Sequence, residues 1–227
     1  PGPERIHHPM GKTANGTYES WDMVASGLAA VWARDNTREA LYEAMKRRET
    51  YATTGPRIMV RFFGGWDFVE SDAMSRLPAN AGYSKGVPMG SDLPVYEGEG
   101  VPKFLVAALK DPLSGNLDRI QIVKGWLDKS GKRHEKVFDV AWSDNRQAGT
   151  DGKLPPVGNT VDLPTATWTN TIGAVELIKV WEDPEFDPAL PAVYYARVLE
   201  IPTPRWTAYE EARFGVDFGD DVEMTTQ

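Results

Sequence analysis

RIMVRF, residues 57–62, is the stretch of sequence that decides the fold. In an extended chain Ile58, Val60 and Phe62 fall on one side, while two arginines and a methionine fall on the other, because side chains of a strand point alternately to its two faces. This period of two predicts a strand with one buried face. Gly55-Pro56 directly precedes the stretch, so the change of pattern marks a candidate domain boundary.

Several more strands follow towards the C-terminus. Five apolar or alternating segments carry the signal: residues 104–109, 118–127, 136–142, 174–181 and 192–200. The polar loop DKSGK, residues 128–132, predicts a hairpin between two of them. Short strands bounded by turn residues predict a mainly β fold, an antiparallel β-sandwich over residues 56–214. We expect the acidic end, residues 215–227, to form a loose tail.

Two long connections, residues 64–100 and 143–170, are rich in Gly, Pro, Asp and Asn. Connections of this length in a compact domain are usually functional or pack over a sheet. We expect one of these two outcomes for each connection.

The chain before Gly55 has a different pattern. GLAAVWA, residues 27–33, is an apolar run of strand length. We interpret residues 1–55 as the strand–helix remnant of an α/β domain, whose partners would lie upstream of Pro1. The alternative is that this run joins the β domain and that the following helix packs on its sheet.

The helix predicted over residues 37–48 has an amphipathic pattern. Its buried side would carry Leu41, Ala44 and Met45. Asn36 suits the N-cap position, with a glutamate three residues further on as in a capping box.

Composition excludes several classes of function. The net charge of −8 argues against nucleic acid as a partner, because phosphates require a basic face. No apolar run is long enough to span a membrane. The chain has no cysteine, which excludes disulfides, thiolate catalysis and cysteine-ligated zinc. The cellular compartment stays open, an extracytoplasmic one included, and the N-terminal residues lack a signal-peptide pattern.

Several segments of the sequence together resemble a known family. These are GLAAVWA (27–33), NTREAL (36–41), RRETYATTGPR (47–57), RFFGGW (61–66), KGW (124–126), NTIG (170–173) and YYARVLEIPTPRW (194–206). They resemble the C-terminal part of the bacterial domain-of-unknown-function family 3604, which is similar to the PHP (polymerase and histidinol phosphatase) class. The last segment is the most specific of them.

The resemblance implies that a metal-dependent barrel of hydrolase type precedes this chain, and that this missing N-terminal domain is its partner. In the wider PHP class, clusters of His, Asp and Glu hold two or three divalent metals that activate water for phosphoester hydrolysis. The late metal motif of the family, Ser/Thr-Asp-x-His, belongs upstream of Gly27 and is absent here. The resemblance therefore implies an accessory domain without a complete active site or a metal of its own.

Few residues of the chain suggest catalysis directly. Arg34 and Asp35 follow an apolar strand and precede a helix, and loops of this kind build the active sites of α/β barrels. We expect them to lie near the active site of the parent protein, the alternative being a capping turn. Adjacent His7 and His8 make a poor chelate, and we expect His134 to be a surface hairpin residue.

A group of acidic residues near the last strand could bind a cation. Asp183, Glu185 and Asp187 alternate in a loop and could offer oxygens to calcium, but Pro184 and Pro188 favour a structural turn.

Eight tryptophans are many for a chain of this length. Most would pack in the core, but Trp66 and Trp206 flank irregular segments and could stack a sugar. A carbohydrate- or small-ligand-binding β-sandwich module is therefore the alternative function.

Overall fold

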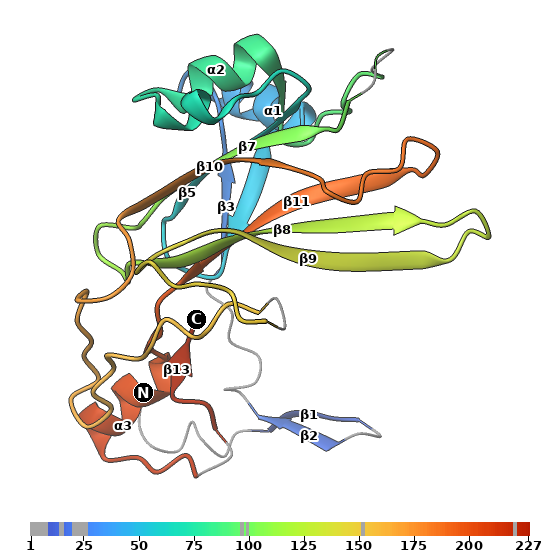
Figure 1. Ribbon diagram of the computed structural model, residues 1–227. Coiled ribbons are helices and arrows are strands. Elements are labelled where there is room, and N and C mark those ends of the chain that lie inside the picture. The colour runs from blue at the N-terminus through green and yellow to red at the C-terminus, as the bar shows by residue number, and fades with distance from the viewer. Residues whose placement is uncertain are drawn as a thin grey trace.

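The computed structural model describes residues 9–13, 16–19, 27–95, 98, 100–150, 153–219 and 222–227. The predicted fold class is confirmed, because the structure is mainly β and two antiparallel sheets stack face to face (Figure 1). A layer of short helices covers the outer face of one sheet, and a small C-terminal subdomain lies beside the other (Figure 1).

The larger sheet has four strands in the order β10-β7-β5-β6. Their bounds are β5 Met59–Gly65, β6 Gly86–Pro88, β7 Lys103–Leu109 and β10 Glu176–Glu182. The stretch that decided the fold enters this sheet as β5, which pairs with β7 along its whole length. β6 covers only the C-terminal half of β5, from Phe63 to Gly65. The first half of β5 therefore needs another partner at that edge.

The second sheet has three strands in the order β11-β8-β9. These are β8 Leu117–Leu127, β9 Arg133–Trp142 and β11 Ala192–Glu200. β8 and β9 form the predicted hairpin, and its loop is ordered by Asp128, whose Oδ1 accepts hydrogen bonds from Ser130 N at 2.8 Å and Lys132 N at 3.0 Å. The donors of Ser130 and His134 also lower the pKa of Asp128.

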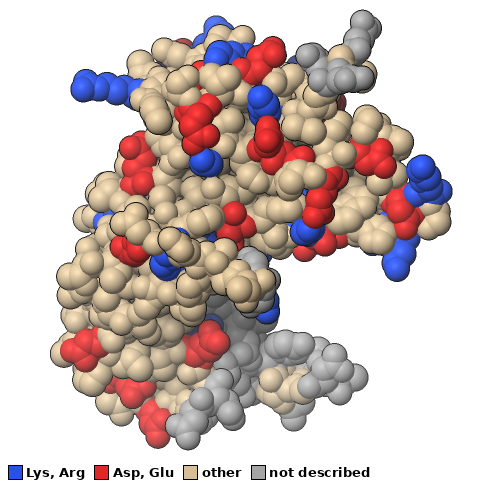
Figure 2. All heavy atoms as spheres, in the orientation of Figure 1, with Lys and Arg blue, Asp and Glu red and all other residues tan. Residues whose placement is uncertain are grey.

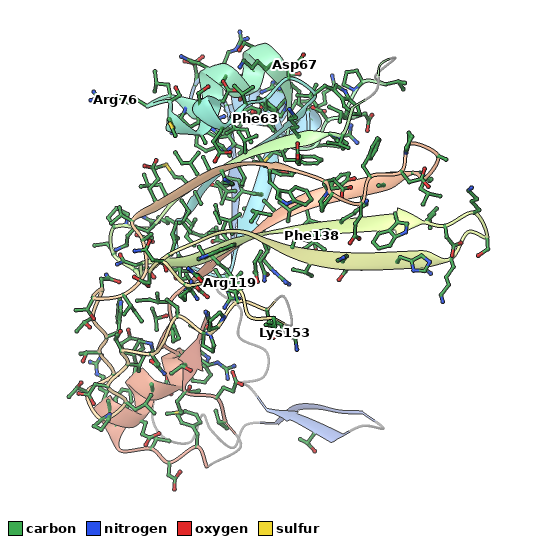
Figure 3. The ribbon with its side chains drawn as sticks, in the orientation of Figure 1. Phe63, Asp67, Arg76, Arg119, Phe138 and Lys153 are labelled. Atoms are coloured by element: carbon green, nitrogen blue, oxygen red, sulfur yellow. The ribbon has the colours of Figure 1, made fainter. Side chains whose placement is uncertain are left out.

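The main core lies between the two sheets. Ile58, Val60 and Phe62 point into it, as their alternation predicted, together with Ile120 and Ile122 of β8. Burying one side chain of this size stabilises the fold by about 1.5–3 kcal/mol. Phe138 of β9 lies at the margin of this core (Figure 3).

The outer face of the four-stranded sheet is covered by a helical layer. Helix η3, Glu70–Met74, and helix α2, Pro78–Lys85, lie in the long connection between β5 and β7. Phe63 points into this layer (Figure 3), where a Cβ on Gly82 would lie 2.4 Å from its ring. The first long connection thus packs over a sheet, one of the two expected outcomes.

The N-terminal strand–helix pattern forms a compact unit of its own. β3, Leu28–Val31, runs into α1, Arg38–Lys46, and pairs antiparallel with β4, Thr50–Thr53. This unit covers the open half of β5: Trp32 Nε1 donates to Val60 O at 2.8 Å, and Tyr51 OH donates to Ile58 O at 3.0 Å. Whether residues 1–55 belong to a preceding domain stays a prediction.

Two details of the predicted helix are wrong. Thr37, not Asn36, is the N-cap, because its hydroxyl accepts the hydrogen bond of Ala40 N at 3.2 Å. Met45 is 53% exposed, while Ala44 is fully buried and Leu41 half-buried. The helix packs through small and medium side chains, so its apolar stripe is narrower than the sequence suggested.

The C-terminal residues form more structure than expected. β12, Thr203–Pro204, pairs with β13, Thr225–Thr226, on either side of α3, Trp206–Phe214. Val222 is buried and Gln227 Nε2 donates to Asp118 Oδ2 at 2.7 Å. The expectation of a loose tail is therefore wrong for residues 222–227.

Two short strands, β1 Pro9–Thr13 and β2 Gly16–Glu19, form an antiparallel ribbon of their own (Figure 1). Among the described residues, no helix is both long and apolar enough to cross a membrane. Lysine, arginine, aspartate and glutamate side chains are interspersed over the face shown in Figure 2.

Candidate functional site

A groove of about 1080 Å³ opens at the side of the sandwich. It lies where β4, the loop after β6, the turn before β11 and the first half of β11 meet. Its floor is the inner face of β5 and β7, at Val60, Phe62 and Phe104. Ligand sites of proteins usually have volumes of about 300–1,000 Å³, so the groove is large enough for an extended ligand.

The aromatic rings of the groove are held by internal hydrogen bonds. Trp66 Nε1 donates to Pro94 O at 3.0 Å, and its ring meets Phe186 edge to face with centroids 5.9 Å apart. Tyr194 OH donates to Asp183 Oδ2 at 2.7 Å. Burial and the Asp183 carboxylate raise the pKa of Tyr194 far above its usual value. The Trp66 N–H and the Tyr194 hydroxyl thus already donate hydrogen bonds within the protein. The two rings would therefore contact a ligand mainly through their faces.

A buried ion pair supports one end of the groove. Asp183 is fully buried and Lys124 is 5% exposed. Lys124 Nζ lies 2.5 Å from Asp183 Oδ2 and donates to Glu185 O at 2.7 Å. Asp183 Oδ1 accepts the backbone N–H of Glu185 at 2.9 Å. The loop considered as a calcium site is thus the structural turn that the sequence favoured, because its buried carboxylate binds Lys124 and Tyr194.

Charge is sparse among the described residues that line the groove. Arg48 and Asp92 are its charged members, and they approach each other to 3.9 Å at the exposed rim. Arg48 has a φ of 62°, and a Cβ on Gly90 would lie 2.1 Å from Arg48 O. Gly90 therefore lets the loop after β6 press against the turn that leads into β4.

A network of polar side chains fixes the N-terminal unit beside this groove. Glu49 is 4% exposed and accepts a short hydrogen bond from Tyr83 OH of helix α2. Arg47 and Arg61 approach the Glu49 carboxylate to 3.4 and 3.7 Å, and Arg61 stacks 3.2 Å above the Trp32 ring. The network joins the turn before β4, β5 and α2, so it holds one wall of the groove in place.

Another buried carboxyl group lies at the far end of β11. Glu200 is 7% exposed, and its Oε2 accepts the hydroxyl of Ser114 at 3.0 Å. Its Oε1 has no hydrogen-bond partner among the described residues. Burial raises the pKa of Glu200 to about 7, so this group titrates near neutral pH.

The structure separates the predicted site residues. Trp66 lines the groove. Trp206 lies at the start of α3 in the C-terminal subdomain, with its ring edge to face against Phe218 at 5.7 Å. Arg34 and Asp35 are exposed in the loop between β3 and α1. This loop and the Arg47–Arg48 turn lie at the same end of the β3–β4 ribbon. Their roles in catalysis or binding stay predictions.

The histidines do not form a site in the part of the chain that the structure describes. His134 lies in the hairpin as expected, with Nε2 2.8 Å from Asp128 Oδ2 and its ring stacked on Trp126. His7 and His8 lie outside the described residues. Among the described residues, no group of three or more His, Asp or Glu could hold a metal ion.

Most of the aromatic residues that line the groove were not predicted from the sequence. Tyr51, Phe186, Tyr194 and Tyr195 line it beside Trp66. Their aromatic character was visible in the sequence, but they come from three separate segments. The Pro-rich turn before β11 was the signal that could have indicated Phe186, because it places an aromatic side chain between rigid residues.

Comparison with known proteins gives a family but no activity. No curated protein and no solved structure matches this chain. The sequence profile of DUF3604, described as a protein of unknown function, matches residues 2–227. Since the match covers nearly the whole chain, this protein belongs to the DUF3604 family.

Proposed function

We propose that this chain is the accessory C-terminal domain of a metal-dependent hydrolase of the PHP type. The family resemblance supports this proposal, because it implies that a metal motif lies upstream of Gly27. The divalent metals and the phosphoester chemistry would belong to the preceding domain. This chain would shape that domain and help to select its substrate.

The observation that carries the proposal is a set of exposed apolar side chains on the N-terminal unit. Leu28 of β3 is 43% exposed, and Tyr42 and Met45 of α1 are 62% and 53% exposed. Tyr42 and Met45 lie three residues apart and therefore share one face of the helix. Exposed apolar side chains grouped on one element are typical of protein–protein contacts. A preceding domain would bury these side chains.

The edge of the unit supports the same interpretation. Among the described residues, β3 pairs with β4 alone, and a strand with an open edge is suited to pair with a further strand. Arg34 and Asp35 lie in the loop that follows β3. In the proposed assembly this loop lies near the active site of the preceding domain.

The test uses the full-length parent protein. Met45→Glu places a charge in the proposed contact, so we expect a lower midpoint of thermal unfolding and lower turnover of p-nitrophenyl phosphate with added Mn²⁺. Val175→Glu is the matched control, since Val175 is 60% exposed and lies just before β10. Equal stability and turnover for both variants would contradict the proposal, as would a parent sequence without a His/Asp cluster upstream.

A small-ligand-binding module is the second candidate, and the groove favours it. A sugar could stack on Trp66, but the Trp66 and Phe186 rings stand 69° apart rather than coplanar. Trp66→Ala should abolish binding of cellohexaose by the isolated chain, while Trp206→Ala should leave it unchanged. Equal affinities for the two variants would exclude Trp66 as a sugar platform.

A further inference from the structure

Five consecutive residues of β11, Ala192 to Ala196, line the groove. Side chains of a strand alternate between its two faces, so a cavity that lies over one face touches every second residue. A run of consecutive lining residues instead means that the edge of the strand faces the cavity. Three consecutive residues of β4, Thr50 to Ala52, line the opposite wall in the same way.

The register shows which backbone groups of β11 point into the groove. Leu127 N of β8 donates to Pro191 O at 3.2 Å, and Gly125 pairs with Val193. In an antiparallel ladder the hydrogen-bonded pairs recur at every second residue. Val193 and Tyr195 therefore direct their N–H and C=O groups to β8. Ala192, Tyr194 and Ala196 direct theirs to the other edge, where no described strand pairs with β11.

The side chains around this edge suit a neutral, partly apolar ligand. Val193 is 68% and Tyr195 51% exposed on the outer face of the sheet, whereas Tyr194 and Ala196 face the core. Arg48 and Asp92 offset each other at the rim. The hydrogen-bond donors of Tyr194 and Trp66 are occupied within the protein. Among the described residues, few side chains thus remain to bind sugar hydroxyls, while the backbone groups of Ala192, Tyr194 and Ala196 have no strand partner.

We propose that the groove binds an extended polypeptide segment, which adds to β11 as a fourth strand of the three-stranded sheet. Main-chain hydrogen bonds to Ala192, Tyr194 and Ala196 would give affinity, as in other cases of strand addition. Alternate side chains of the bound segment would contact the aromatic rings of the groove, so the ligand carries apolar residues at every second position. This site does not depend on a preceding hydrolase domain.

The test uses the purified chain and a capped decapeptide of alternating valine and threonine. We expect titration calorimetry to show binding, and hydrogen exchange to slow at Ala192–Ala196 when the peptide is present. The same peptide with every backbone nitrogen methylated cannot donate a hydrogen bond along either edge. It should bind at least tenfold more weakly, because several main-chain hydrogen bonds are lost.

Two proline variants distinguish the open edge of β11 from the opposite edge of the same sheet, on β9. Ala196→Pro removes a donor that faces the groove and leaves the ladder to β8 intact, so affinity should fall three- to tenfold. Val137→Pro is the matched control, since the register places its N–H at the opposite edge, on β9. Circular dichroism tests whether both variants fold. If Ala196→Pro does not fold, the comparison between the methylated and unmethylated peptides tests the proposal.

Three comparisons between ligands or variants would overturn the proposal. These are equal binding of the methylated and unmethylated peptides, equal weakening by the two proline variants, and tighter binding of cellohexaose than of peptide at the same site. The last result would assign the groove to carbohydrate. Absence of binding by the decapeptide and by every member of a random linear peptide library would also refute strand addition.

Discussion

Replacement of Asp183 by alanine tests whether the buried ion pair holds the groove together. The change removes three contacts at once: the Lys124 ammonium at 2.5 Å, the Tyr194 hydroxyl at 2.7 Å and the Glu185 N–H at 2.9 Å. Lys124 would stay buried without its counter-charge. Breaking a buried pair in this way costs about 3–5 kcal/mol. For a domain of this size, that corresponds to a fall in the unfolding midpoint of roughly 6–20 °C.

The assay is urea unfolding followed by tryptophan fluorescence, with the slope of the transition used to check that both proteins unfold in the same way. Glu182→Ala is the control, because Glu182 is the exposed neighbour of Asp183. It should change the free energy of unfolding by less than about 0.5 kcal/mol. The double variant Lys124→Met/Asp183→Leu should recover much of the loss, since an apolar pair often replaces a buried ion pair at little cost.

A loss below about 1 kcal/mol for Asp183→Ala would refute the reasoning. It would mean that water reaches Lys124 in the folded protein and solvates the ammonium. The groove would then have a more open end than the structure shows, and the rings of Tyr194 and Phe186 would lack the rigid support described above.

Three further predictions concern stability. Leu41→Ala should lower the free energy of unfolding by about 1–3 kcal/mol, because the Leu41 side chain is half-buried. Met45→Ala should lower it by less than about 0.5 kcal/mol, because the Met45 side chain is exposed. Equal effects of the two variants in urea unfolding would contradict this packing. Gly82→Ala should destabilise the protein by about 1–3 kcal/mol, because the new Cβ would lie 2.4 Å from the Phe63 ring. This loss should exceed the gain from the better helix propensity of alanine. A rise in the midpoint of thermal unfolding would disprove the close contact. The pKa of Glu200 is raised from 4.5 to about 7, so this carboxyl group binds more protons in the folded state than in the unfolded state in that range. Its contribution to stability should therefore be largest below pH 4.5 and be lost as pH rises to about 7. In urea titrations at several pH values, the difference in the free energy of unfolding between the wild type and Glu200→Gln should change over this range, and a constant difference would exclude Glu200 as a source of pH dependence.

The strands of the sandwich could be predicted because their signals are local. Alternation at Ile58, Val60 and Phe62 and the polar loop after Leu127 report directly on one buried face and one turn. The helix α2 could not be predicted in the same way. It begins with Pro78 and contains Gly82, and it packs through small residues whose burial depends on the sheet beneath them.

The candidate site was predicted only in part, for a topological reason. Trp66 was selected because it follows two glycines before an irregular segment, and the structure places it in the groove. The edge of β11 gave no comparable signal. The segment reads as a strand, but which of its edges remains open depends on strand order, and strand order depends on contacts between distant segments.

The hydrogen bonds that Trp32 and Tyr51 donate to the edge of β5 have a practical consequence for handling this protein. A shortened chain that begins at Pro56, at the boundary suggested by the sequence, would lack Trp32 and Tyr51. The carbonyl groups of Ile58 and Val60 would then lose the donors that cover them. An uncovered strand edge beside an apolar core promotes edge-to-edge aggregation. The segment before Gly55 therefore also acts as a solubility element, and expression of the sandwich alone should yield insoluble protein unless this segment is retained.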